Sequence, residues 1–190
     1  MTQTRTAAAA RRLAVVLAAA GSLGLASPQA AFAATQGSLG ATSTGTVTIT
    51  ASVPARARLT GLADVAFTNQ DPAIAASSAQ SVCVWSNTAT RAYTITASGS
   101  GAANAFTLAS GALTTPYSVQ WNAASGQTSG TALAAGTASA TLTSAATQQS
   151  CASGPTASAS LIVGIATSDL QTMQAATSYT GTLTLLITPQ

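Results

Sequence analysis

Few side chains in this chain could do acid–base or metal chemistry. The 190 residues hold three acidic side chains, Asp64, Asp71 and Asp169, and no His, Lys or Glu. Proton-transfer catalysis usually relies on His, Glu, Asp or Lys with a pKa tuned toward neutrality, and zinc sites need clusters of His, Cys or carboxylate. A Ser nucleophile would lack a His or Lys base. The sequence therefore predicts a protein that is not an enzyme and that uses no metal or cofactor.

The Asp and aromatic residues have both structural and functional interpretations. Each Asp lies in a sequence typical of a turn, which favours capping or solvation over glycoside hydrolysis or weak calcium binding. Trp85, Tyr93, Tyr117 and Trp121 could form a sugar-binding platform. Aromatic residues on alternating strands are more often core or cross-strand pairs, and we expect them in the core.

The first 33 residues have the layout of a signal peptide. Three Arg precede an apolar stretch, Leu13–Leu25, which is too short to span a membrane, and Ala31-Phe32-Ala33 fits a small-x-small cleavage site. We expect cleavage before Ala34 and export without membrane insertion. The exported chain, residues 34–190, carries three Arg and three Asp, so it has no formal net charge. Nucleic acid is not expected as a partner, because binding it needs a basic patch.

The chain has two Cys, Cys83 and Cys151. An even count in an exported protein predicts one disulfide, and two buried free thiols are the alternative. A bridge across so long a loop would contribute roughly 4 kcal/mol on the chain-entropy model.

Apolar and polar residues alternate along much of the exported chain, as in β-strands. In residues 46–60 the apolar side chains share one parity and the Thr, Ser and Arg side chains the other. Pro54 cannot donate to a ladder, so we expect two strands, 45–53 and 55–60. Residues 138–146 and 169–176 could be short helical turns. Further strands, spaced as in an all-β sandwich, are expected over residues 62–67, 80–85, 92–97, 105–109, 117–121, 139–143, 158–165 and 180–188.

Several of these segments resemble chaperone–usher pilins. Gly45-Thr-Val-Thr-Ile-Thr-Ala-Ser-Val-Pro54 resembles the N-terminal donor segment of alternate (alpha-clade) major fimbrial subunits. Thr115-Pro-Tyr-Ser-Val-Gln-Trp121 and Ser178-Tyr-Thr-Gly-Thr-Leu-Thr-Leu-Leu-Ile-Thr-Pro189 are similar to two later strands of those subunits. Ser81-Val-Cys-Val84 and Tyr93-Thr-Ile-Thr-Ala-Ser-Gly99 are similar to segments of the spore coat protein U family. Alpha-clade subunits generally lack a disulfide, and coat protein U pairs its Cys differently, so the resemblance does not choose between the two.

The resemblance implies an all-β fold, an incomplete immunoglobulin-like β-sandwich over residues 55–190, completed by a donor strand. Residues 34–54 would be the donor segment, which leaves its own domain and fills the groove of the next copy. Its groove-filling side chains would be Val47, Ile49, Ala51 and Val53. The closing strand would contribute Leu183, Leu185 and Ile187 to the groove and core. Leu186 breaks the alternation there, so we expect a bulge or burial on both faces.

The implied function is that of a structural subunit of a bacterial surface fimbria that supports adhesion or biofilm formation. Head-to-tail contacts between copies do not close, so they generate a fibre. The implied partners are neighbouring copies, a periplasmic chaperone and an outer-membrane usher, with a host receptor or glycan as a further candidate. The protein would pass through the periplasm to the cell surface. Two alternatives stay open: a spore or cell-coat protein of the coat-U type, and a monomeric secreted carbohydrate-binding β-sandwich.

Overall fold

The computed structural model describes residues 33–190, so the expected signal peptide, residues 1–33, lies outside the described residues except for Ala33. The chain divides into two units, the first ending at Ala51 and the second covering Ser52–Gln190. The described part of the first unit contains a single bridge, in which the backbones of Thr35 and Thr46 exchange two hydrogen bonds of 2.9 Å. The expected strand 45–53 therefore forms no ladder with any other part of residues 33–190.

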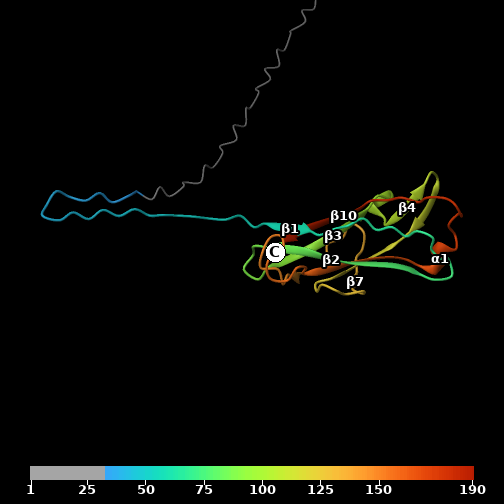
Figure 1. Cartoon of the computed structure of the whole chain (residues 1–190). Helices are drawn as coiled ribbons and strands as arrows, with labels where there is room; N and C mark the ends of the chain where they lie inside the picture. Colours follow the sequence, from blue (N-terminus) through green and yellow to red (C-terminus); the bar gives the residue numbers. More distant parts are fainter. Residues whose placement is uncertain (1–32) are drawn as a thin grey trace, which may run out of the picture. The chain divides into compact units, whose positions relative to one another are not determined.

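The regular secondary structure of the second unit consists almost entirely of antiparallel strands (Figure 1). One short helix, α1 (Thr167–Leu170), and a 3₁₀ turn, Ala102–Asn104, interrupt them. The strands are β1 (Ala57–Thr60), β2 (Ala76–Ser86), β3 (Ala92–Gly99), β4 (Thr107–Ser110), β5 (Leu113–Pro116), β6 (Ser118–Asn122), β7 (Thr131–Ala132), β8 (Leu142–Thr143), β9 (Ala159–Ile165) and β10 (Leu183–Pro189).

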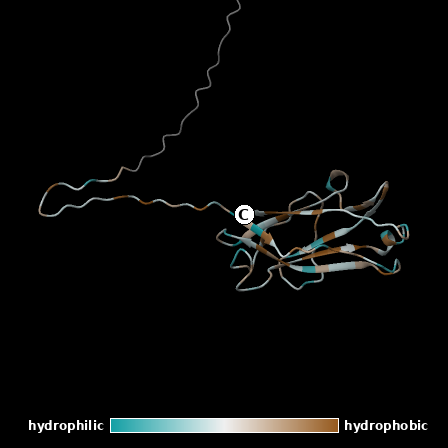
Figure 2. Ribbon diagram, turned by 45° about the horizontal axis from the view of Figure 1, so that its top comes forward, coloured by the Kyte–Doolittle hydropathy of each residue, from teal (hydrophilic) through white to brown (hydrophobic). Residues whose placement is uncertain are grey.

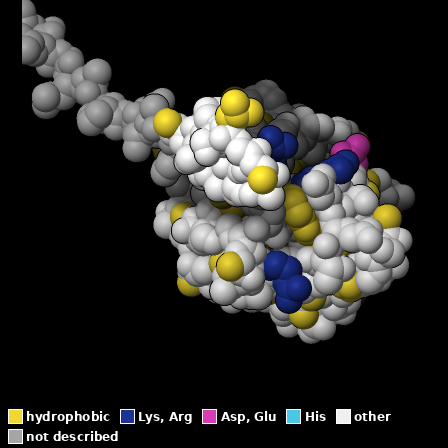
Figure 3. All heavy atoms as spheres, turned by 90° about the vertical axis from the view of Figure 1, so that its left-hand side faces the viewer, with side chains coloured by type: hydrophobic (Ala, Val, Ile, Leu, Met, Phe, Trp, Pro, Cys, Tyr) yellow, Lys and Arg dark blue, Asp and Glu magenta, His cyan; other side chains and the backbone are white. Residues whose placement is uncertain are grey.

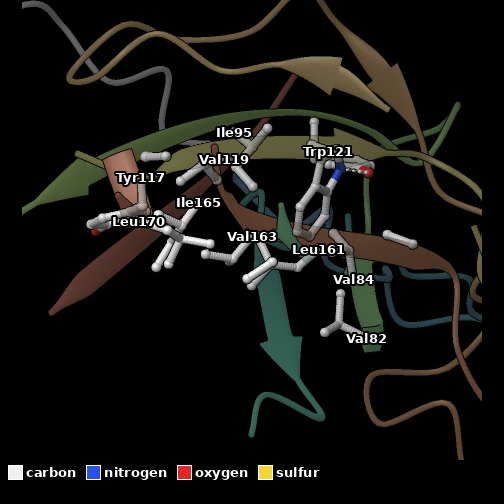
Figure 4. Close-up of a cluster of buried hydrophobic side chains, with 14 residues drawn as sticks. Val82, Val84, Ile95, Tyr117, Val119, Trp121, Leu161, Val163, Ile165 and Leu170 are labelled. Carbon is white, nitrogen blue, oxygen red and sulfur yellow. Dashed lines mark hydrogen bonds between the residues drawn. The ribbon is translucent and has the colours of Figure 1, made fainter. Parts of the chain in front are cut away.

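The strands form two main sheets that share one core. One sheet has the order β1-β2-β9-β6-β7 and the other β10-β3-β8, while β4 and β5 form a separate hairpin. Hydrophobic residues recur along the strands of both sheets (Figure 2). Their inward side chains pack together in the buried cluster of Figure 4, as the period-two alternation predicts. The all-β prediction is confirmed, and the arrangement is compatible with a sandwich.

A second expected strand is also absent. Residues 62–67 join no sheet, although their alternation is that of a strand. Gly61, with a φ of +84°, turns the chain after β1. Beyond it the Gln80 side chain replaces a ladder partner: the Ala63 N–H donates to Gln80 Oε1 at 2.7 Å, and Gln80 Nε2 donates to the Ala63 carbonyl at 3.1 Å. In this stretch, alternation therefore predicts which side chains face the core, but it does not predict backbone pairing.

The expectation for Leu186 is wrong. The register of β10 against β3 runs without interruption from Leu183↔Gly99 to Pro189↔Tyr93, so there is no bulge. Leu186 is 59% exposed, so it is not buried on both faces either. It shares the outer face of the sheet with Thr184 and Thr188, which are also exposed. Single exposed Leu side chains are common on protein surfaces and need no special packing.

The predicted disulfide is confirmed. Cys83 in β2 and Cys151 are bonded at an S–S distance of 2.07 Å, with their Cα atoms 5.9 Å apart. Both are buried in a small second cluster with Ala146, against which Trp85 packs. The bridge fastens the loop between β8 and β9, which has little regular structure of its own, to the sheet.

Replacing Ser158 with Ala is expected to lower the free energy of unfolding by about 1–3 kcal/mol, because it leaves a buried donor without a partner. Ser158 Oγ accepts a hydrogen bond from the Val84 N–H and donates to the Val84 carbonyl, both at 2.8 Å, one residue before β9 begins. Denaturant unfolding measures the loss. The matched control is Ser118→Ala, whose hydroxyl makes an exposed bond to the Gly164 carbonyl. Equal free energies of unfolding for Ser158→Ala and Ser118→Ala would contradict the role of the Ser158 hydroxyl.

Candidate functional site

Both main sheets end in a strand with a free edge. Within residues 33–190, β10 has a ladder with β3 alone, and β1 has one with β2 alone. These two edge strands approach each other, one from each sheet. The N–H and C=O groups along an unpaired edge are a template for a further strand. This corner of the unit is therefore where another segment can pair.

A groove of about 1280 Å³ lies at the same corner. Its lining includes two irregular stretches, residues 62–70 and 173–182, which belong to no strand. Core side chains also line it: Leu108, Tyr117, Leu161, Val163 and Ile165. An apolar groove next to an unpaired edge can take an extended segment whose alternate side chains point inward.

The closing-strand residues lie partly in this groove. Leu183, Leu185 and Ile187 are half-buried and pack against the main core. Leu183 and Leu185 also line the groove, whereas Ile187 does not. The groove therefore extends along the first half of β10, toward α1.

The expected donor side chains present apolar surface to solvent. Val47 is 72% exposed, Ile49 87% and Val53 79%, and Ala51 is exposed as well. Residues 45–53 carry no charge. A row of large apolar side chains on one parity is more than the scattered exposure usual on protein surfaces, and it marks a surface suited to association.

The aromatic residues are core, as expected. Tyr93 and Trp121 are buried, and Trp121 Nε1 donates to the Tyr93 hydroxyl at 3.1 Å. Tyr117 is buried against Phe106, with ring centroids 5.6 Å apart. Trp85 is half-buried beside the disulfide. These four side chains form no exposed platform for a sugar.

The unit is expected to lose stability above about pH 10, the ordinary pKa of Tyr. Burial raises the pKa of Tyr93, against a smaller lowering by its hydrogen bond with Trp121, and burial raises the pKa of Tyr117. The neutral form is thus favoured in the folded state, so this stability is complete below the unfolded pKa and is lost as pH rises through the folded values. Phenolate absorbance and circular dichroism should change together. Ionisation of these residues well before unfolding would contradict the prediction.

The three Asp side chains have ordinary structural surroundings. Asp71 Oδ1 accepts a bond from the Ala73 N–H at 2.9 Å, Asp169 lies in the first turn of α1, and Asp64 is exposed. In the described part of the chain, no three His, Cys, Asp or Glu side chains gather as they would around a metal.

Charged side chains are also sparse on the face drawn in Figure 3. Among residues 33–190, no helix has the length and apolar character needed to cross a membrane.

Sequence reasoning missed two parts of this site. It did not identify residues 173–182 as a flank of the groove, and no periodic pattern there could have done so. It also missed Gln80, for which a polar residue within an otherwise small and apolar strand was the available signal.

No protein-family model, curated protein or solved structure matches the chain, so the interpretation of the groove rests on its own geometry.

Proposed function

We propose that this protein is a structural subunit of a bacterial surface fimbria, assembled head-to-tail by donor-strand exchange through a chaperone–usher pathway. The observation that carries the proposal is the unpaired edge of β10 beside a groove that core side chains help to line. Residues 45–53 of a second copy fill that groove. Their backbone pairs with β10, and their alternate apolar side chains enter between the sheets.

The strand order supports an incomplete immunoglobulin-like sandwich. In that fold one sheet has the order A-B-E-D, and the other holds C, F and G. The order β1-β2-β9-β6 corresponds to the first sheet, and β3 with β10 to C and F. Among the described residues no strand occupies the position of G, next to β10. The donor segment of a neighbour takes this position.

The energetics require both side chains and backbone. Burying a Val or Ile side chain completely contributes about 1.5–3 kcal/mol, so Val47, Ile49 and Val53 together contribute about 5–9 kcal/mol. Association costs roughly 4–15 kcal/mol in lost freedom of motion. The burial of the three side chains alone offsets the cost of association only in the lower part of that range. Backbone hydrogen bonds to β10 supply the rest.

Charge and symmetry fit the same assembly. The exported chain has no formal net charge and the donor segment none at all, so copies do not repel one another. Donor and acceptor surfaces differ, which makes the contact heterologous and open-ended, and such contacts generate filaments. Before assembly the free edge invites aggregation. A periplasmic chaperone that lends a strand protects it until the usher exchanges that strand for a neighbour's segment.

The experiment compares cells that carry the gene with cells that lack it, by electron microscopy with an antibody against the exported chain. The proposal expects labelled filaments that disappear with the gene. Extracts should show a ladder of multimers that resists mild denaturation. Label confined to a spore or cell coat would favour the coat-U alternative, and a protein that stays monomeric would favour a secreted carbohydrate-binding sandwich. Either result overturns the fimbrial function.

A further inference from the structure

One residue that lines the groove carries an unsatisfied polar atom. Tyr117 is 8% exposed, and its hydroxyl is the one buried side-chain polar atom in residues 33–190 without a hydrogen-bond partner. Buried polar groups in folded proteins almost always have a partner, so each exception calls for an explanation. Tyr93 provides the contrast, since its buried hydroxyl accepts a bond from Trp121.

Tyr117 lies at one end of the groove. It lines the groove with Leu170 of α1 and with Leu183, the first residue of β10. Figure 4 places Tyr117 beside Leu170 at one end of the core cluster, with Trp121 toward the other end. On one flank of the groove, the backbone N–H groups of residues 64–68 donate no hydrogen bond, so this stretch can adjust when a segment enters. The missing partner of the hydroxyl can thus come from whatever fills the groove.

We propose that Tyr117 fixes the register of the entering strand, because its hydroxyl hydrogen-bonds the backbone of a second copy's segment 45–53 at Ala51. This inference rests on the proposed function and names the specificity-determining residue of its groove. An empty groove leaves the hydroxyl unsatisfied, and a filled one satisfies it. The same side chain therefore destabilises the empty state and stabilises the filled state.

The choice of Ala51 follows from strand direction and side-chain size. Every ladder between the named strands is antiparallel, and the one parallel pairing among residues 33–190 is an isolated bridge between Ala97 and Ala135. An added strand antiparallel to β10 ends near Leu183, so the later residues of the segment reach the Tyr117 end. Ala51 and Val53 are the inward residues there, and Ala51 is the one short side chain of the row. A short side chain lets the backbone come close to the phenol.

The test uses the exported chain carrying Ile49→Asp, which blocks its own assembly, and a synthetic peptide of residues 44–55. Without peptide, Tyr117→Phe should raise Tm by about 3 °C or more, because it removes the unsatisfied oxygen. With peptide, the same variant should bind about tenfold more weakly. The matched control, Tyr93→Phe, should lower Tm with or without peptide and leave the peptide affinity unchanged. Exchanging Ile49 and Ala51 within the peptide, which keeps its composition, should also weaken binding by about tenfold or more.

The outcomes separate this inference from the proposed function. If the peptide does not bind the chain that retains Tyr117, the proposed function fails, and the inference fails with it. If it binds that chain and Tyr117→Phe equally well, the function stands and the role of Tyr117 is overturned. If the exchanged peptide binds as well as the original, the register at Ala51 is overturned. The inference is supported if Tyr117→Phe stabilises the domain when the groove is empty and weakens binding of the peptide that fills it.

Discussion

Replacing Ile49 with Asp is expected to abolish fibre formation while leaving the domain of residues 52–190 folded as before. Ile49 is 87% exposed, so the substitution removes no packing within the chain. In the groove of a neighbour the new carboxylate would be buried among apolar side chains without a partner. That burial costs several kcal/mol, comparable with the whole side-chain contribution to assembly.

The matched control is Thr48→Asp, one residue away on the opposite parity. In an added strand Thr48 points away from the core, so its carboxylate stays in water. Electron microscopy and denaturation-resistant ladders should show fibres for Thr48→Asp and none for Ile49→Asp. Thermal unfolding of the unassembled subunits should give both variants the Tm of the unassembled parent. Fibres from Ile49→Asp as abundant as those of the parent would refute donor-strand exchange.

Removing the disulfide by replacing both Cys83 and Cys151 with Ser is expected to lower stability by roughly 4 kcal/mol. For a domain of this size that corresponds to a Tm lower by about 8–16 °C. The large effect follows from the 68-residue separation of the two cysteines, because the cross-link restricts the unfolded chain most when the loop is long. The loop that follows β8 also loses its covalent attachment to β2.

Reduction of the unmodified protein is the control for this variant. A reducing agent should lower its Tm to that of the double Ser variant and should leave the variant unchanged. Thiol titration of the denatured, unreduced exported chain should find almost no free thiol. Two free thiols per chain, or a double variant as stable as the parent, would show that the bridge contributes little.

The strands that could be predicted from sequence are those with strict alternation and a buried face. β3 and β9 lie within two residues of their expected limits, and β10 lies within three, because period-two alternation reports burial directly. β7 was missed, since Thr131–Ala132 is too short to show a period. Residues 62–67 were predicted as a strand because they alternate, but alternation does not report pairing, and here the Gln80 side chain takes the place of a ladder partner at Ala63.

The candidate site likewise has parts that could be predicted from the sequence and parts that could not. The apolar rows of residues 47–53 and 183–187 are visible in the sequence because alternation reveals them. The groove between the sheets is not visible, since its flanks are irregular and meet only through the topology. The orphan hydroxyl of Tyr117 is likewise a property of the packed structure, because no sequence pattern states which polar groups find partners.

The contact between Gln80 and Ala63 makes the state of the groove measurable by hydrogen exchange. Ala63 is held by a side chain, whereas no hydrogen bond is donated by the backbone N–H groups of residues 64–68. In an empty subunit these amides should exchange nearly as fast as in an unfolded chain. A strand lodged between β10 and this stretch would slow them sharply while Ala63 changed little. The exchange rates of these five consecutive amides would then report what fraction of the grooves in a preparation is occupied.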